Sequence, residues 1–212
     1  MFDMPSAEGL LPTVSKDSTE KLRAFAEAVR HWTRSINLIS ESSVDEIWQR
    51  HILDALQILE FAPSEARLWC DMGSGAGFPG LVAAIVNLEK NPQCSHVLIE
   101  ADRRKAAFLT LQSKALGLRC AVTCDRIEKV EAVRADVVTA RALAPMPLLL
   151  SYAYRHAGAG ATCIFPKGKG VEAEVDASRR DFSFDVDFHR SKTDPQGSIL
   201  VIKNLTPRGK GK

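Results

Sequence analysis

The first third of the chain carries two apolar stripes with the spacing of helices. In residues 17–34, apolar side chains recur every three or four positions, at Leu22, Phe25, Ala26, Val29 and Trp32. In residues 43–61, the capping-box pattern of Ser43 and Glu46 precedes a second stripe, and Pro63 follows it. These patterns predict two helices, over 17–34 and 43–61.

From Arg67 onward, the pattern changes to short apolar runs that alternate with longer helical segments. The runs predict strands over 67–72, 95–100, 118–124, 135–140, 160–168, 182–190 and 198–204. The segments between them predict helices over 79–90, 102–117, 127–133, 145–157 and 170–180. This alternation is typical of an α/β fold, in which a mainly parallel sheet has helices on both faces. We expect seven strands, of which the last two form an antiparallel pair.

The length of 212 residues suits one domain with a small additional segment. We expect an N-terminal helical extension over 1–66 and an α/β domain over 67–205. The remaining residues, 206–212, read as a short basic tail.

The composition indicates a soluble globular protein, since 45% of the residues are hydrophobic and 25% are charged. No stretch approaches the roughly eighteen consecutive apolar residues of a membrane span. The first residues lack the basic segment of a signal peptide. The five cysteines form no CxxC pair, which favours reduced thiols over disulfides or a metal site. We therefore expect a cytoplasmic protein without membrane contact, and we expect a monomer.

Charge is distributed unevenly along the chain. Residues 1–66 hold 6 Lys and Arg against 11 Asp and Glu, whereas residues 67–212 hold 22 against 15. The basic excess therefore lies in the part that carries the α/β pattern. Such an excess suits a polyanionic partner, although many enzymes without one are as basic.

The segment DMGSGAGFPG, residues 71–80, lies between the first predicted strand and the helix that follows it. Ligands of open α/β sheets bind beyond the carboxyl ends of the strands, so this loop is the expected ligand site. Gly73, Gly75 and Gly77 allow sharp turns and a close approach of the backbone to a ligand.

Three ligands compete for this loop. A nucleoside triphosphate is rejected, because the P-loop pattern needs a Lys and a Ser or Thr that do not follow Gly80. A dinucleotide fits the GxGxxG pattern of Gly75, Gly77 and Gly80, but Asp71 would repel its pyrophosphate. S-adenosylmethionine carries a sulfonium and an ammonium but no phosphate, so Asp71 favours it. Glu100, which ends the second predicted strand, is expected to bind the ribose hydroxyls.

The third predicted strand ends in CDRIE, which we expect near the adenine. Either Asp125 contacts the adenine amine or the loop backbone flanks the ring, and Ile127 supplies apolar cover. Glu128 takes part in this contact or only caps the next helix.

The fourth predicted strand runs into TARAL, the edge that would face a transferable methyl group. This edge lacks the Asn or Asp with Pro-Pro-aromatic that serves amine methylation, and it lacks the Cys that cytosine C5 methylation needs. A site without a base suits a nucleophile that has no proton to lose, such as guanine N7. Arg141 is expected to hold the cofactor, or to donate to the guanine edge or to a phosphate.

Four further polar residues have candidate roles. Lys167 and Lys169 in FPKGKG are candidate phosphate contacts, with solvated lysines as the alternative. His51 borders the apolar stripe of the second predicted helix and is interpreted as structural. Asn37 is interpreted as a turn residue, with contact to the substrate as the alternative.

Five segments in this order, SINLIS, RHILDAL, DMGSGAGFPGL, LIEADRRKAAFL and TARAL, resemble the RsmG family, also called GidB. This family methylates guanine N7 in the 530 loop of bacterial 16S rRNA. The resemblance covers about residues 20–205. It implies the class I methyltransferase fold, S-adenosylmethionine as methyl donor, and 16S rRNA as partner, within the small subunit or its precursor.

By matching motif positions, the resemblance implies cofactor contacts at Gly73, Phe78, the backbone around Ile127 and Glu128, and Arg141. The chain departs from the family pattern in DRIE, where R-V-E is usual, and in FPKGKG, which matches the K-G stretch only in part. Two other functions remain alternatives: an NAD(P)-dependent oxidoreductase, and a non-catalytic RNA-binding module with a vestigial cofactor fold.

Overall fold

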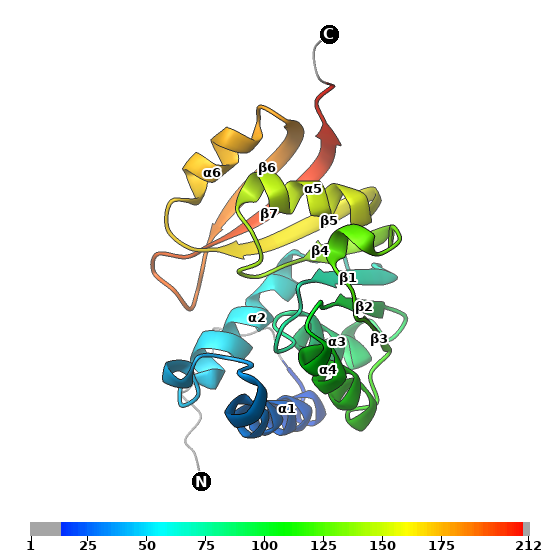
Figure 1. Ribbon diagram of the computed structural model, residues 1–212, viewed down its shortest axis with the longest axis vertical. Coiled ribbons are helices and arrows are strands. Elements are labelled where there is room, and N and C mark those ends of the chain that lie inside the picture. Colours follow the sequence, from blue (N-terminus) through cyan, green and yellow to red (C-terminus); the bar gives the residue numbers. More distant parts are fainter. Residues whose placement is uncertain (1–13, 210–212) are drawn as a thin grey trace.

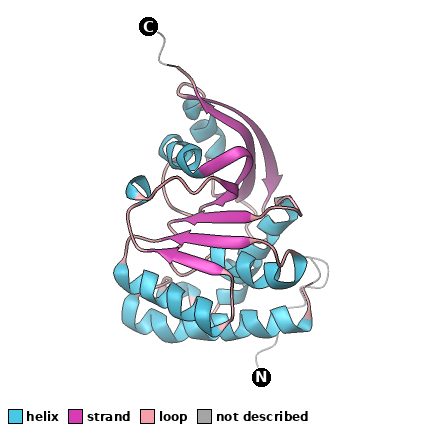
Figure 2. Ribbon diagram, turned by 90° about the vertical axis from the view of Figure 1, so that its right-hand side faces the viewer, coloured by secondary structure: helices cyan, strands magenta, loops and turns pink. Residues whose placement is uncertain are grey.

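A seven-stranded sheet forms the centre of the protein, and helices cover both of its faces (Figures 1 and 2). The computed structural model describes residues 14–209. The strand order is β3-β2-β1-β4-β5-β7-β6. Neighbouring strands pair in parallel except β7, which is antiparallel to both β5 and β6. The predicted fold class, with its antiparallel last pair, is confirmed.

The elements follow the predicted alternation closely. The strands are β1 Leu68–Met72, β2 Ser95–Ile99, β3 Cys120–Thr123, β4 Ala135–Thr139, β5 Ala157–Lys167, β6 Phe182–Arg190 and β7 Ser198–Pro207. The α-helices are α1 Lys16–Ile36, α2 Asp54–Leu56, α3 Gly80–Lys90, α4 Arg103–Ala115, α5 Met146–His156 and α6 Val171–Ser178. A π-helical segment spans Trp48–Leu53, and 3-10 turns lie at Glu41–Ser43, Gln57–Phe61 and Ile127–Lys129.

The central strands are apolar at successive positions because both faces of the sheet are covered. Trp69 and Val137 pack in one cluster, with side chains of α3 and of the turn Gln57–Phe61. Their chain neighbours Cys70 and Val138 pack in another cluster, with side chains of α5 and α6. Side chains alternate between the faces along each strand, so neighbouring residues contribute to opposite layers of core.

The single helix predicted over 43–61 is wrong in form. The chain there is first π-helical, then α-helical in α2, then 3-10. The capping box is absent as well: the Ser43 hydroxyl donates to the Ser40 carbonyl at 2.8 Å and lies 3.0 Å from Nε2 of His51. These contacts engage the hydroxyl, so it does not cap a helix.

The short helix predicted over 127–133 is reduced to the single 3-10 turn Ile127–Lys129. Val130 has extended backbone, with φ of −67° and ψ of 139°. Its carbonyl, which a continuing helix would need as an acceptor, instead accepts from the Arg155 guanidinium at 2.8 and 3.1 Å. This long-range contact ends the helix early.

The first predicted helix is confirmed as α1, and it packs against α3 and α4. Phe25 of α1 contacts Phe78 of the glycine loop, with ring centroids 5.3 Å apart, and Phe108 of α4. Asn37 ends α1 in the left-handed conformation, as expected for a turn residue. The N-terminal helix therefore shares one core with the α/β layers and supports the loop from behind.

Both ends of the chain extend beyond the described residues. The first residues, on which the expectation of no signal peptide rests, and residues 210–212 of the predicted tail lie outside them. β7 continues to Pro207, two residues into the segment expected as tail. Within residues 14–209, no helix is long and apolar enough to cross a membrane. All five cysteines are free thiols.

Candidate active site

The glycine loop lies at the carboxyl edge of the sheet, between β1 and α3. The chain passes from β1 to β2 on one side and later returns to β4 on the other, so this is the switch point where α/β proteins bind ligands. A cavity of about 510 Å³ opens beside the loop. It is lined by six of the predicted site residues: Gly73, Gly75, Glu100, Ile127, Glu128 and Arg141. We call this the loop cavity.

The glycines of the loop differ in the space around them and in whether they line the loop cavity. Gly73 and Gly75 have φ of 66° and 56°, which L side chains rarely adopt. A Cβ on Gly75 would meet only the Gly73 carbonyl oxygen, at an ordinary contact distance of 3.8 Å, whereas one on Gly73 would lie 2.6 Å from Cδ1 of Leu143. Gly77 does not line the loop cavity. Its Cβ position points toward α3 instead, where a Cβ would lie 2.8 Å from Cδ1 of Leu81. Gly75 thus leaves room for a ligand, and Gly77 allows the loop to close onto α3.

Glu100 is held at the rim of the loop cavity by two backbone groups. Its Oε2 accepts from the Gly75 N–H at 2.7 Å, and its Oε1 accepts from the Asp102 N–H at 2.8 Å. Each carboxylate oxygen retains acceptor capacity. Glu100 therefore links the end of β2 to the glycine loop and still offers acceptors to a pair of ligand hydroxyls.

Asp71 lies one layer below the cavity instead of facing it. Its side chain is fully buried, and Oδ1 accepts from the Thr139 hydroxyl at 2.7 Å. Burial raises the pKa of Asp71 to about 6, and the hydrogen bond from Thr139 opposes this rise. A Cβ on Gly80 would lie 2.6 Å from Oδ2, so the carboxylate sits beneath the start of α3. Strand alternation explains this, since Asp71 points to the face that α3 covers.

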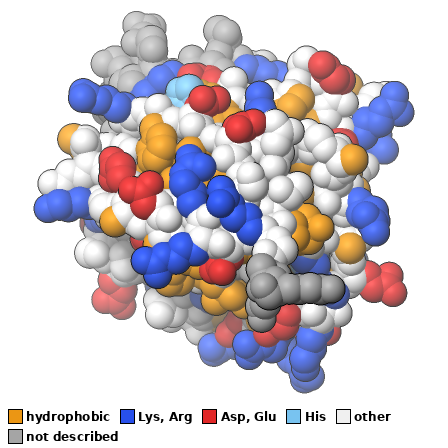
Figure 3. Space-filling model, turned by 90° about the horizontal axis from the view of Figure 1, so that it is seen from above, with side chains coloured by type: hydrophobic (Ala, Val, Ile, Leu, Met, Phe, Trp, Pro, Cys, Tyr) orange, Lys and Arg blue, Asp and Glu red, His pale blue; other side chains and the backbone are white. Residues whose placement is uncertain are grey.

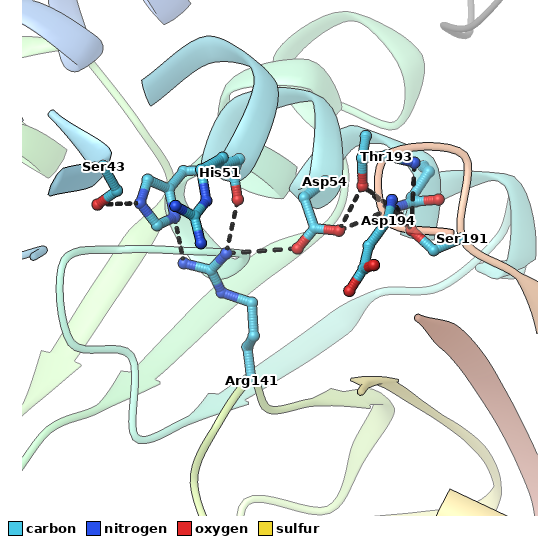
Figure 4. Close-up of polar contacts among 9 residues, drawn as sticks. Ser43, His51, Asp54, Arg141, Ser191, Thr193 and Asp194 are labelled. Carbon is cyan, nitrogen blue, oxygen red and sulfur yellow. Dashed lines mark hydrogen bonds and ion pairs between the residues drawn. The ribbon is translucent and has the colours of Figure 1, made fainter. Parts of the chain in front are cut away.

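Arg141 follows β4 and is fixed by the segment of residues 50–54 (Figure 4). Its Nη1 donates to the Arg50 carbonyl at 3.2 Å and pairs with Oδ2 of Asp54 at 3.3 Å. Its Nη2 donates to Nδ1 of His51 at 2.9 Å. The guanidinium also lies 5.4 Å from the ring centroid of Phe78. Burial lowers the pKa of Arg141, and the Asp54 carboxylate opposes that change.

His51 is a hydrogen-bond acceptor for Arg141. A guanidinium has only donors, so Nδ1 of His51 must be unprotonated and Nε2 must carry the proton. Nε2 then donates to the Ser43 hydroxyl at 3.0 Å. Burial and the neighbouring Arg141 and Arg50 lower the pKa of His51 to about 4, so the ring is neutral at pH 7. His51 was predicted to be structural, and its contacts show what it does: it orients the guanidinium of Arg141.

Phe78 lies behind this cluster and does not line the loop cavity. Its ring stacks on that of His51, with centroids 5.1 Å apart and planes inclined by 18°. It is 4% exposed and also packs against Phe25, with ring centroids 5.3 Å apart. The structure therefore places Phe78 as a support for the loop and for His51.

The CDRIE segment reaches the loop cavity through its second half. Ile127 is buried and lines the cavity. Glu128 is exposed and pairs with Nε of Arg126 at 2.7 Å, so it does not cap a helix. Asp125 accepts from the Arg126 N–H and is not among the lining residues.

A second cavity of about 290 Å³ lies on the other side of Arg141 and Ala142, which line both cavities. We call it the lysine cavity, because Lys167 and Lys169 line it. Lys167 is 15% exposed; its ammonium pairs with Glu174 at 2.7 Å and donates to the Ala144 carbonyl at 3.3 Å. Lys169 is exposed, and within the described part of the chain no ion pair engages it.

Several lining residues escaped the sequence analysis. Asp54 lines the lysine cavity, and Leu148 and Tyr152 of α5 line the loop cavity. The signal for Asp54 was present: His51 and Asp54 are polar residues three positions apart beside an apolar stripe. For Leu148 and Tyr152 there was none, because exposed apolar positions on a helix are common.

The strand order and the ligand edge are those of the class I methyltransferase fold. Two similar solved structures share this fold at low sequence identity. One, a methyltransferase from Geobacter sulfurreducens, is 15% identical with a TM-score of 0.58, covering 93% of this chain and 93% of that one. The other, an S-adenosylmethionine-dependent methyltransferase from Aquifex aeolicus, is 12% identical with a TM-score of 0.57, covering 90% and 99%.

The family follows from the sequence comparisons. The model of the GidB family, described as rRNA small subunit methyltransferase G, matches residues 18–202. A relative of that name from Cereibacter sphaeroides is 43% identical over 192 residues, which cover 91% of this chain and 93% of the relative. Another from Ruegeria pomeroyi is 39% identical over 203 residues, covering 96% and 98%. The chain belongs to this family, as the resemblance predicted.

Proposed function

We propose that the protein transfers the methyl group of S-adenosylmethionine to N7 of a guanine in the 530 loop of 16S rRNA. The observation that carries this proposal is the position of Arg141, which separates the loop cavity from the lysine cavity. A donor in the first cavity and an acceptor in the second would meet at this residue. The family relatives, which are named as small-subunit rRNA methyltransferases, support the choice of substrate.

The loop cavity fits S-adenosylmethionine. Glu100 supplies fixed acceptors for the ribose hydroxyls, and the part of the loop cavity beside Gly75 admits the part of the ligand that crosses the loop. Ile127 offers apolar cover to the adenine, with Glu128 at the rim. Asp71 contributes a negative charge from below, next to a site for a cationic ligand. Gly77 and Phe78 shape the loop from behind.

Transfer to guanine N7 needs alignment more than acid–base catalysis. S-adenosylmethionine supplies a methyl group on a positively charged sulfur. N7 would take this methyl group with its lone pair and the electrons of the S–C bond would stay on sulfur, so no residue of the protein would need to remove a proton. Arg141, fixed by Asp54 and His51, can hold the acceptor in line with the methyl group.

The RNA is expected to approach from the side of the lysine cavity. Lys169 is exposed there, and Lys167 retains one N–H for a phosphate after its two contacts. Figure 3 shows Lys and Arg side chains mixed with Asp and Glu side chains on the face seen from above. The two lysines of the lysine cavity suit binding to RNA within the small subunit or its precursor, by a cytoplasmic monomer.

Calorimetry with S-adenosylhomocysteine and with NAD, combined with methyl transfer to small subunits that lack the modification, tests this function. We expect tight binding of S-adenosylhomocysteine, no binding of NAD, and label in the rRNA. Binding of NAD alone would establish an oxidoreductase. Binding of RNA and of S-adenosylhomocysteine without transfer would establish a binding module.

A further inference from the structure

The lysine cavity contains acceptors as well as cations, and one carboxylate oxygen in it, on the exposed Asp194, has no hydrogen-bond partner among residues 14–209. Among its acidic lining residues, Asp54 engages Arg141 through Oδ2, and Gln57 and Thr193 through Oδ1. Glu174 is engaged by Lys167 and by a backbone N–H. Asp194 differs: in residues 14–209, no hydrogen bond or ion pair engages its Oδ2.

Asp194 is placed by a tight turn in the loop between β6 and β7. The Ser191 hydroxyl oxygen accepts from the backbone N–H groups of Thr193 and Asp194, at 3.2 and 3.1 Å. Oδ1 of Asp194 accepts from the Gln196 N–H at 2.9 Å. These bonds hold one carboxylate oxygen in the turn and leave the other free.

The turn is tied to Arg141 through Asp54 (Figure 4). The Thr193 hydroxyl donates to Oδ1 of Asp54 at 2.8 Å, and Gln57 accepts from the Lys192 N–H at 2.8 Å. One carboxylate thus fixes both the guanidinium at one wall of the cavity and the loop at another. The separation between Arg141 and Asp194 is therefore set by the protein before any substrate arrives.

These groups match the two edges of a guanine better than they match a phosphate. Guanine presents the acceptors N7 and O6 on one edge, and the donors N1–H and N2–H on its Watson–Crick edge. Adenine offers no N–H at N1. A free carboxylate repels a phosphate, but it accepts hydrogen bonds from the N1–H and N2–H groups of guanine.

We propose that the lysine cavity receives the acceptor guanine and that Asp194 accepts hydrogen bonds from its Watson–Crick edge. N7 can then face Arg141 and the loop cavity, because N7 and the N2 amino group lie at opposite ends of the base. The proposal rests on the proposed function and adds the group that selects guanine over adenine. Asp194 is thus a specificity-determining residue, whereas Lys169 contacts the RNA backbone.

The variant Asp194→Asn tests this assignment without removing the turn. Asn keeps an oxygen for the Gln196 N–H and is common in such turns, but it loses the charge and puts an N–H₂ where an acceptor was needed. We expect kcat/KM on unmethylated small subunits to fall about tenfold or more. The affinity for S-adenosylhomocysteine should not change. Asp187→Asn, on an exposed position of β6 outside the cavity, is the matched control and should be fully active.

Replacing the target guanosine by inosine in reconstituted subunits gives a second measurement, since inosine lacks the N2 amino group. The wild-type protein should lose activity on inosine, and Asp194→Asn should lose proportionally less. Equal losses in both proteins, or full activity of Asp194→Asn on guanosine, would overturn the proposal but leave the proposed function intact. Tighter RNA binding by Asp194→Asn would instead assign the cavity to a phosphate and also overturn it. A wild-type protein that methylates neither substrate would overturn both.

Discussion

The loop cavity and the lysine cavity share Arg141 but are built in different ways. The loop cavity is formed by segments that follow successive strands, and sheet topology brings such segments to one edge. The lysine cavity depends on side-chain contacts between distant segments, such as that of Asp54 with Thr193, 139 positions apart. The shape of the loop cavity is therefore set by the fold, whereas the shape of the lysine cavity is set by a few polar contacts. Single substitutions should be able to disturb one cavity and leave the other intact.

The largest effect is expected from Gly75→Val, which acts on the loop cavity alone. The branched side chain would extend into the loop cavity that Gly75 lines, at a φ of 56° that it tolerates poorly. Binding of S-adenosylhomocysteine should fall below detection by calorimetry, while the protein remains folded by circular dichroism.

Gly117→Val is the matched control for this variant. Gly117 also has a positive φ, of 66°, and open space around its Cβ position, but it lies after α4, away from both cavities. It should share the backbone strain and keep the affinity. Unchanged affinity in Gly75→Val would remove the loop from the cofactor site.

Arg141→Ala should affect both cavities, since this residue lines both. We expect methyl transfer to fall at least about tenfold, the loss of one good charged contact. Single-turnover rates on small subunits measure the effect, with Arg119→Ala, outside both cavities, as control. Full activity of Arg141→Ala would mean that the guanidinium only stabilises the segment of residues 50–54.

His51→Ala should act through Arg141 and mainly on the lysine cavity. Loss of the acceptor for Nη2 frees the guanidinium, so kcat should fall several-fold while the affinity for S-adenosylhomocysteine changes little. His51→Asn offers an amide oxygen in the place of Nδ1 and should restore most of the rate. Equal losses in both variants would point to the packing of His51 on Phe78 instead.

The pH dependence of stability gives a smaller and independent test of His51. Its pKa is about 4 in the folded protein and about 6.5 when unfolded, so the unfolded chain binds the proton first as pH falls. Stability should therefore decrease between pH 6.5 and 4. The Tm of the wild-type protein should fall by a few degrees more than that of His51→Asn from pH 7 to 5. The opposite contribution of Asp71, with its raised pKa, is common to both proteins and cancels in the difference.

The smallest effect is expected from Lys169→Ala, which removes an exposed charge from the lysine cavity. RNA affinity should weaken modestly, and the slope of log K against log salt should decrease by about one or less. Lys90→Ala, at the end of α3, is the control for net charge. An unchanged slope would make Lys169 a solvated lysine, the alternative that the sequence left open.

Much of the fold was predictable because it depends on patterns within short segments. Apolar runs located all seven strands, and their alternation with helices indicated a parallel sheet. Two helices were mispredicted where side-chain contacts that span more than one helical turn decide the local structure. Ser43 is engaged by His51 instead of a capping contact, and the carbonyl of Val130 is taken by Arg155.

The candidate site was predictable to the extent that it follows strand ends. Gly73, Gly75, Glu100 and Ile127 were found in this way and line one cavity. Asp71 was expected beside the ligand, but which face a strand residue takes is decided by the packing of α3. Asp194 could not be found from the sequence, because its place depends on a loop that Asp54 holds from the other end of the chain.

The most direct test of the central claim is mapping of 7-methylguanosine after reaction of the purified protein with unmethylated small subunits. Labelled S-adenosylmethionine would supply the methyl group, and the rRNA would be digested and sequenced at the modified position. The account predicts one labelled guanine, modified at N7 and located in the 530 loop of 16S rRNA. Absence of label, or label on another atom or in another region, would contradict it.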